Sequence, residues 1–276
     1  MKFQNEFLGE LLGTFLLVLF GCGSVAATIL FNAHQGLFQI ALIWGIGVSL
    51  AIYLTRHLCC AHLNPAVTLA MVLAKRMSAN RMPAYLSGQF SGAFLAGYAL
   101  FFLFAPSIGR YEEQQGIIRG SIESVSTAKM FGEFYLVGYG SSWTSMLHAM
   151  GAEAFGTFLL VLMIFALTEG CNIGRPDNAL APVFIGLTVT AIICLIAPLT
   201  QAGLNPARDF GPRVVAYING WGDAAFPDTT GGFFFVYILA PMVGAVLAGI
   251  FFIRILEPQM KRSTQPCDCT DEKPTK

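Results

Sequence analysis

The chain has 276 residues, of which 55% are hydrophobic and 12% are charged, and its mean hydropathy is +0.64. A soluble protein of this length could not cover so much apolar surface with so few charged residues, so the composition predicts a membrane protein. The formal net charge is zero and no long basic run is present, which excludes a nucleic acid as an expected partner. The 7 cysteines are an odd number, and most lie in apolar stretches as small core residues, so we expect no disulfide framework.

Six apolar stretches are long enough to cross a hydrocarbon core of about 30 Å, which takes about 20 residues. In chain order these are 6–31, 37–56, 83–106, 148–168, 179–200 and 233–254. The first exceeds the apolar core of a signal peptide and contains Glu10, so we expect a retained span. The polar residues 257–276 predict a disordered tail, whose Cys267 and Cys269 are too few for a metal site.

Basic residues gather on one side of the predicted membrane. With a cytoplasmic N-terminus, that side carries Lys2, Arg56, Lys75, Arg76, Arg81, Arg175, Arg254, Lys261 and Arg262. The long loop 107–147 on the other side carries only Arg110, Arg119 and Lys129. Because cytoplasmic loops are enriched in Lys and Arg, we expect both termini in the cytoplasm.

Two further apolar segments, 57–75 and 200–219, are too short to cross and must return to the side from which they come. Both contain an Asn-Pro-Ala motif, formed by Asn64, Pro65 and Ala66 in the first and by Asn205, Pro206 and Ala207 in the second. Asn is a favourable N-cap and Pro suits the first helical position. We therefore expect a loop that descends into the protein, followed by a half-length helix that starts at Asn64 or Asn205.

The two halves of the chain repeat one another. ELLGTFLLVL at 10–19 returns as EAFGTFLLVL at 153–162, LNPA at 63–66 returns at 204–207, and GAFLAG at 92–97 returns as GAVLAG at 244–249. Matched blocks in the same order indicate an internal duplication. The halves, 6–106 and 148–256, each have an odd number of spans, so the repeat is inverted and the half-helix N-termini meet near the midplane. The sequence thus predicts one all-α membrane domain over 1–256, with six transmembrane helices, two re-entrant half-helices and a connecting loop, 107–147.

The paired half-helices indicate which solutes could cross. Two facing helix N-termini place about +0.5 charge each in a low-dielectric site, which repels cations and protons but not neutral solutes. The side-chain amides of Asn64 and Asn205 can donate replaceable hydrogen bonds to a passing oxygen atom. One Asn-Pro alone would indicate an ordinary capped turn, and it is the inverted duplication that favours a pore.

Arg208 stands in the first turn of the second half-helix, where a cation opposes the helix dipole and is costly at membrane depth. We expect it to be functional, with a structural clamp on loop carbonyls as the alternative. Asp209 and Arg213 are spaced to pair on the same helix, and we expect them to have a mainly structural role at the rim.

Three residue types in the apolar segments have structural interpretations. Glu10 and Glu153 are equivalent in the two halves, so we expect each to accept N–H bonds from its re-entrant loop rather than to relay protons. His62 has no partner in its motif and is expected to be a hydrogen-bonded core histidine rather than a proton shuttle or metal ligand. Trp44 lies deeper than an aromatic belt, which leaves lipid, packing and the pore open, with packing as the default.

The motifs HLNPAVT and LNPARDFGPR, with RGSIESV at 119–125, are similar to those of a known family. Over residues 6–256 the chain resembles the major intrinsic protein (aquaporin) family, and more closely its aquaglyceroporin branch, the bacterial glycerol uptake facilitators. The resemblance implies a central station at the two asparagines and four subunits with one pore each. It also implies an outer constriction formed by Trp44 and Arg208, and Asp209 matches the acidic residue typical of glycerol-type members.

Three positions depart from the pattern of that family. Ile193 stands where glycerol facilitators usually have glycine and many water-selective members have histidine, and Ala202 stands where an aromatic is common. Tyr237 stands where many members have proline. The aromatic wedge that lines the carbon backbone of glycerol is therefore incomplete, and we expect Ile193 to fill part of the gap. The expected filter consists of Trp44, Ile193, Ala202 and Arg208.

Together these features predict a passive channel in a cell membrane, by resemblance a bacterial inner membrane, for glycerol, other small neutral solutes and water, without cofactor or metal. A water-selective pore is the alternative in the same class, disfavoured by Asp209 and by the missing histidine at 193. An inverted-repeat secondary transporter would need a charged coupling site. An enzyme would need a nucleophile, a base and an orienting partner that the spans do not supply. Whether loop 107–147 covers the pore stays open.

Overall fold

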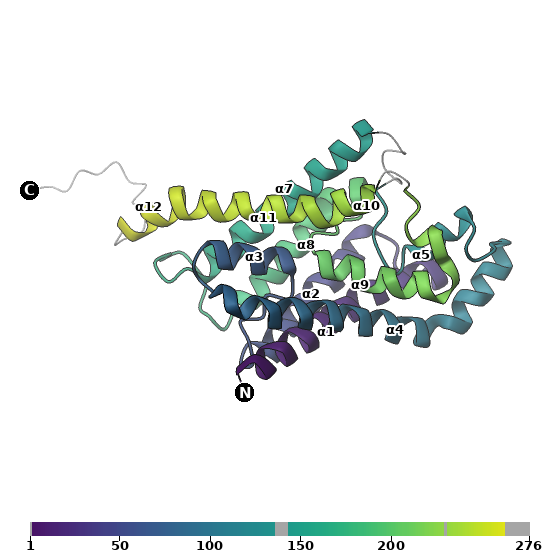
Figure 1. Cartoon of the computed structure of the whole chain (residues 1–276), viewed down its shortest axis with the longest axis horizontal. Helices are drawn as coiled ribbons and strands as arrows, with labels where there is room; N and C mark the ends of the chain where they lie inside the picture. Colours follow the sequence, from purple (N-terminus) through teal and green to yellow (C-terminus); the bar gives the residue numbers. More distant parts are fainter. Residues whose placement is uncertain (1, 136–142, 229–230, 263–276) are drawn as a thin grey trace, which may run out of the picture.

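The computed structural model describes residues 2–135, 143–228 and 231–262, which form a bundle of helices (Figure 1). Six helical segments are long and apolar enough to cross a membrane, and the described residues contain no β-strand. Five of these segments are α1 Lys2–Phe31, α2 Leu37–Thr55, α4 Met82–Gln115, α7 Trp143–Thr168 and α8 Ala181–Thr200. The sixth passes through α10 Gly232–Phe234, α11 Ala240–Phe251 and α12 Glu257–Arg262, with wider π-type turns between them. The predicted all-α membrane fold is confirmed.

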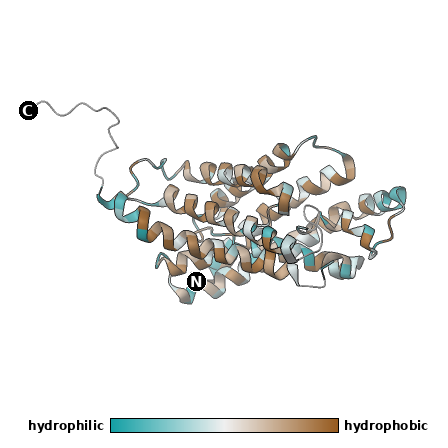
Figure 2. Cartoon of the chain, turned by 90° about the horizontal axis from the view of Figure 1, so that it is seen from above, coloured by the Kyte–Doolittle hydropathy of each residue, from teal (hydrophilic) through white to brown (hydrophobic). Residues whose placement is uncertain are grey.

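The outer surface of the bundle suits a lipid environment. Hydrophobic residues dominate its middle, and hydrophilic ones gather toward its two ends (Figure 2). Many large apolar side chains on the long helices are exposed, among them Phe102, Leu103 and Leu147. Soluble monomers rarely expose so much contiguous apolar surface, so these side chains face the bilayer.

Two short helices, α3 Pro65–Leu73 and α9 Pro206–Ala216, lie among the long ones and follow one another along the bundle (Figure 1). Each begins with Pro directly after an Asn N-cap. Asn64 Oδ1 accepts the N–H of Ala66 at 2.8 Å, and Asn205 Oδ1 accepts those of Ala207 at 3.1 Å and Arg208 at 3.2 Å. The caps satisfy N–H groups that the first helical turn leaves without partners.

The two halves pack by the same rule. In the first half α1 contacts α2 and α4, and in the second α7 contacts α8 and α11. Each half-helix also packs against the third span of the opposite half, α3 against α11 and α9 against α4. At matched positions, a side chain at Gly92 would overlap the carbonyl of Leu11, and one at Gly244 would overlap the carbonyl of Ala154. These glycines let the helix backbones touch, as small residues do in membrane bundles.

The segment 107–147 is more helical than the expected loop. Helix α4 continues to Gln115, well past the apolar stretch, because its polar end is rich in good helix formers such as Glu112 and Glu113. It ends at Gly116, whose φ of +66° provides the left-handed cap that glycine adopts easily. Two short helical turns follow, Ile122–Ser124 and α5 Val125–Ala128, and residues 136–142 lie outside the described part.

Residues 257–262, which we expected to begin a disordered tail, are helical. Helix α12 extends the last span to Arg262, and Lys261 Nζ donates to Glu257 Oε1 at 2.5 Å, one turn away. Such pairs stabilise a helix against its polar composition. Residues 263–276, which include Cys267 and Cys269, lie outside the described residues.

Candidate functional site

The N-termini of α3 and α9 meet in the middle of the bundle and are tied to each other. Asn64 Nδ2 donates to the carbonyl of Leu204 at 2.9 Å, and Asn205 Nδ2 donates to the carbonyl of Leu63 at 2.7 Å. Each amide has two N–H groups, so one remains for another acceptor. The structure therefore brings both motifs together in reciprocal contact, with the side-chain oxygens serving as caps and the nitrogens as bridges.

A cavity of about 340 Å³ passes this meeting point. At one end it is lined by Arg56, Arg76 and Asn178, near the ends of the spans. It then passes His62, Asn64 and Asn205, and its other end is lined by Trp44, Ile193, Ala202 and Arg208. The four residues of the expected filter thus line one cavity together with the two asparagines.

The cavity has one apolar side. Side chains from α1, α2, α7 and α8 form it, and they include Leu17, Val48, Ile52, Leu160, Ile164, Ile185 and Val189. Apolar side chains offer a passing solute dispersion contacts but no hydrogen bond. Polar contacts must therefore come from elsewhere, chiefly from the two re-entrant loops and Arg208.

The re-entrant loops supply backbone carbonyls to the cavity. Residues 60–62 and 202–203 line it, and no described residue donates a hydrogen bond to their carbonyl oxygens. Alternate residues adopt left-handed φ values: Ala61 at +51° and Leu63 at +55°, then Ala202 at +64° and Leu204 at +56°. Such strained non-glycine conformations persist where the surrounding structure holds them, and they cluster at functional sites. The irregular backbone is tolerated at this depth because it lines a cavity.

Two buried carboxylates hold these loops in place. Glu10 accepts the N–H groups of His62 at 2.8 Å and Leu63 at 2.7 Å, and Glu153 accepts those of Gly203 at 2.8 Å and Leu204 at 2.7 Å. Glu10 also accepts a bond from Gln89 Nε2 at 2.7 Å, and Glu153 one from the Thr200 hydroxyl at 2.5 Å. Neither glutamate lines the cavity, so their oxygens bind the loops rather than a solute.

His62 contributes to the first loop. Its Nδ1 lies 3.2 Å from the Thr68 hydroxyl, and its ring packs 4.7 Å from that of Tyr85, centre to centre. It therefore has the hydroxyl partner that its motif alone did not reveal. Among the described residues, no cluster of three His, Cys, Asp or Glu side chains could hold a metal ion.

At the end of the cavity lined by Ile193 and Ala202, Arg208 lies over Trp44. The guanidinium carbon is 4.0 Å from the centre of the indole ring, close enough for a cation–π interaction. Gly21 makes room for this ring, since any side chain there would overlap the indole. Among the described residues, the buried Nη1 of this guanidinium makes no well-directed hydrogen bond. Trp44 is thus placed at the cavity, where the sequence had left its environment open.

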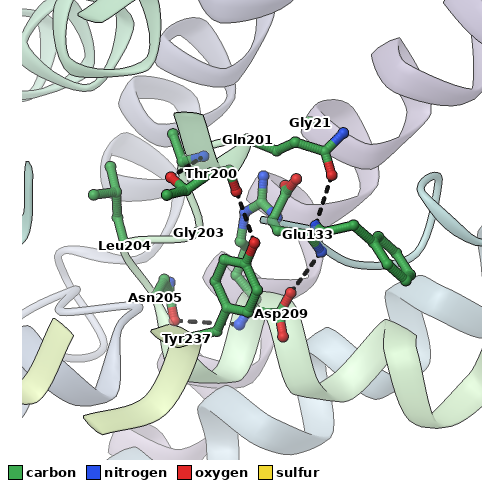
Figure 3. A network of polar contacts seen from close by, with 12 residues as sticks. Gly21, Glu133, Thr200, Gln201, Gly203, Leu204, Asn205, Asp209 and Tyr237 are labelled. Carbon is green, nitrogen blue, oxygen red and sulfur yellow. Dashed lines mark hydrogen bonds and ion pairs between the residues drawn. The ribbon is translucent and has the colours of Figure 1, made fainter. Parts of the chain in front are cut away.

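Asp209 and Arg213 are buried and pair with each other. Arg213 donates to Asp209 at 2.8 Å and to the carbonyl of Ala225 at 2.6 Å. Tyr237 lies behind the second loop, where its hydroxyl donates to the carbonyl of Thr200 at 2.9 Å (Figure 3). Tyr237 does not line the cavity, so its departure from the family pattern concerns the support of the loop.

Sequence reasoning missed Glu133. This residue lies in the described part of loop 107–147, and its carboxylate forms a buried ion pair with Arg208 Nη1. Figure 3 shows it between the 200–204 loop and Asp209. The available signal was a lone carboxylate in the apolar run MFGEFYLVG, but no periodicity or motif relates it to Arg208.

Comparison with known proteins agrees with this geometry. The family model described as "Major intrinsic protein" matches residues 1–252. The glycerol uptake facilitator protein of Pseudomonas aeruginosa is 38% identical over 98% of this chain and 95% of its own, and a propanediol uptake facilitator of Citrobacter freundii is 39% identical over 92% of each. The solved structure of an aquaglyceroporin from Plasmodium falciparum matches with a TM-score of 0.79 and 25% identity, over 95% of this chain and 100% of its own. The chain belongs to the major intrinsic protein family.

Proposed function

We propose that the protein is a passive membrane channel for glycerol and other small neutral solutes, which also passes water and excludes ions and protons. The observation that carries this function is the cavity that runs past both half-helix N-termini to the Arg208 end. Since its family consists of passive channels, we assign the chain no enzymatic activity. Relatives named as glycerol and propanediol facilitators support a small polyol as solute.

The two sides of the cavity match the two sides of a polyol. The C–H edge of glycerol can lie on Trp44 and Ile193, while its hydroxyls bond Arg208 and the free loop carbonyls. Ile193 lines the cavity, in agreement with our proposal that it replaces part of the volume that an aromatic at 202 would fill. A pocket with one apolar side and a few convergent polar groups recognises shape and hydroxyl pattern together.

Exclusion of cations follows from the facing helix N-termini. Each contributes about +0.5 charge near Asn64 and Asn205, in a site from which water is mostly displaced. A neutral solute exchanges one hydrogen bond for the next along the carbonyls and the two amides, which permits fast release. We assign the asparagines this central role.

The alternatives are less well supported. A water-selective pore would need a narrower and more polar constriction than one with Ile193 and Ala202 on its lining. A secondary transporter would need a carboxylate exposed to the solute path, whereas Glu10 and Glu153 are bonded to loop N–H groups away from the cavity.

The setting of the channel is proposed on the same grounds. The cavity end lined by Arg56 and Arg76 belongs to the basic side of the chain, so we place it, and both termini, in the cytoplasm. The bacterial relatives support an inner membrane, and the family resemblance supports four subunits with one pore each.

Stopped-flow light scattering on proteoliposomes tests the function directly. Purified protein should raise glycerol and water permeability above that of empty liposomes, with flux linear in the gradient and indifferent to imposed proton or sodium gradients. Glycerol accumulation driven by either ion, or permeability equal to that of empty liposomes, would refute the proposal. Urea, a smaller neutral solute with amide groups and no hydroxyls, provides the comparison.

A further inference from the structure

Glu133 contacts Arg208 at the outer end of the cavity. The carboxylate Oε1 and the guanidinium Nη1 form an ion pair, and the two side chains are only 7% and 4% exposed. Nη1 is buried and has no other hydrogen-bond partner among the described residues. Glu133 itself does not line the cavity, so it approaches the guanidinium from outside the solute path.

The backbone around Glu133 is fixed on several sides. Its N–H donates to Asp209 Oδ1 at 2.7 Å, its carbonyl accepts a bond from Arg213 Nη2, and the N–H of Phe134 donates to Gln201 Oε1 at 2.7 Å (Figure 3). The segment is therefore tied to both α9 and the second re-entrant loop. The anchored backbone keeps the Glu133 carboxylate beside Arg208.

Other charges near Arg208 already have partners. Asp209 pairs with Arg213 at 2.8 Å, and Glu153 is bonded to the second loop. Without Glu133, the constriction would carry an unbalanced guanidinium beside the positive N-terminus of α9, in a low-dielectric site. Removing one partner of a buried pair is costly for that reason.

We propose that Glu133 is a specificity-determining positioning residue of this channel: it neutralises Arg208 and holds the guanidinium against Trp44. The inference rests on the proposed function and adds to it a residue from outside the pore lining. With Nη1 tied to Glu133, the remaining guanidinium N–H groups are left to donate to solute hydroxyls, since Arg208 lines the cavity. When the tie is lost, the guanidinium turns into the path and obstructs glycerol more than water.

The ionisation of Glu133 makes this arrangement sensitive to pH. Burial raises the pKa of Glu133 to about 7, against the opposing effect of the Arg208 charge. The titratable and charged groups that face it are Cys22 on α1, Glu153 on α7, Arg208, Asp209 and Arg213 on α9, and Tyr237 in the last span. As the pH falls through about 7 the carboxylate takes up a proton and the ion pair is lost, and as the pH rises the pair forms again.

The test is a pH profile of glycerol and water permeability in proteoliposomes, from about pH 8.5 to 5. This range contains the raised pKa of Glu133 and extends toward the ordinary pKa of a carboxyl group. Wild-type glycerol permeability should be about fivefold higher at the alkaline end, equivalent to one hydrogen bond of about 1 kcal/mol, with water much less affected. Glu133→Gln should show the low glycerol value throughout, and Glu133→Asp, which keeps the charge, should retain a pH dependence. Glu123→Gln, an exposed carboxylate of the same loop, is the matched control and should behave as wild type.

Since His62 also lines the cavity, the flat profile of Glu133→Gln is the result that assigns the pH effect to Glu133. The inference is overturned if Glu133→Gln keeps the wild-type glycerol-to-water ratio and pH profile. A flat wild-type profile also overturns it, even if Glu133→Gln does not assemble. Absence of wild-type glycerol flux at every pH would instead refute the proposed function.

Discussion

The loop that leads into α3 and the loop that leads into α9 share their backbone geometry. Both lead into an Asn-capped helix, and a buried glutamate binds the N–H groups of each. Both have left-handed residues at two alternate positions, and the second loop has a third at Gln201. They diverge directly after the motif, where Val67 and Thr68 of the first correspond to Arg208 and Asp209 of the second.

The shared loop geometry is the scaffold, and the residues that differ after the motif are those that we propose to set selectivity. Val67 and Arg208 both line the cavity, one as a small apolar surface and the other as a charged donor. Thr68 bonds within its own loop and to Gln89, whereas Asp209 holds Arg213 and the Glu133 segment. On the proposed function, one duplicated framework therefore carries a neutral station in one half and a polar constriction in the other.

Removing the shared scaffold should have the largest effect. Glu153→Ala leaves the N–H groups of Gly203 and Leu204 buried without an acceptor, and Glu10→Ala does the same to His62 and Leu63. Each change should cost about 3–5 kcal/mol and strongly reduce the yield of assembled protein. Thermal unfolding and size-exclusion chromatography in detergent measure both effects.

Glu113→Ala, at the exposed end of α4, is the control for loss of a carboxylate and should leave the unfolding temperature unchanged. If Glu10→Ala and Glu153→Ala unfold at the wild-type temperature, the loops do not depend on these glutamates.

Removing the difference between Val67 and Arg208 should change the selectivity of the channel rather than its assembly. In the double variant Arg208→Val with Glu133→Gln, the second half copies the apolar residue of the first and no buried charge is left unpaired. The constriction should widen and admit ions, with conductance at least about tenfold above wild type, since an ion that keeps more of its hydration shell meets a barrier lower by more than about 1.4 kcal/mol. Planar-bilayer recording of potassium current measures it. An assembled double variant with wild-type ion exclusion would assign exclusion to the helix N-termini alone.

The features predictable from sequence were those set by local chemistry or by duplication. The caps at Asn64 and Asn205 follow from Asn-Pro, and the loop contacts of Glu10 and Glu153 follow from their equivalent places in the repeat. The Glu133 contact with Arg208 could not be found this way, because it joins distant parts of the chain across a loop with no repeat. The burial of Asp209 and Arg213 was missed for the same reason, since the covering segment lies in that loop.

The helix ends that differ from the boundaries predicted from the sequence have local explanations. Hydropathy marks where a span leaves the apolar layer, but a helix ends only where its backbone bonding ends, at Gly116 for α4. At the other terminus, the bonded pair of Glu257 and Lys261 extends the last helix beyond the apolar stretch.

A smaller effect is expected on the apolar side of the constriction. Ile193→Gly removes a side chain from the cavity lining, so the size limit should move toward larger polyols while water flux persists. A change of one small apolar group in a pocket is worth about 1–3 kcal/mol, so permeability to a four-carbon polyol should rise by about tenfold. Leu195→Gly, an exposed position on the same helix, controls for the cost of glycine in a helix. An unchanged size limit in Ile193→Gly would show that Ile193 does not replace the missing aromatic.

The smallest effect should come from the apolar counterpart of Arg208. Val67→Ala removes two methyl groups from the cavity lining beside the first motif and disturbs no hydrogen bond, because only the backbone of Val67 is polar. Core Val truncations cost about 1–2 kcal/mol of stability, but the positive helix N-termini, Arg208 and the re-entrant carbonyls all remain. Glycerol and water permeability should therefore stay within about twofold of wild type, with no ion current, because a wider apolar station adds no stabilisation for an unhydrated ion. The same liposome and bilayer assays apply. If Val67→Ala conducts ions as the Arg208 double variant does, selectivity is shared by both halves, and the division between a neutral station and a selective constriction is wrong.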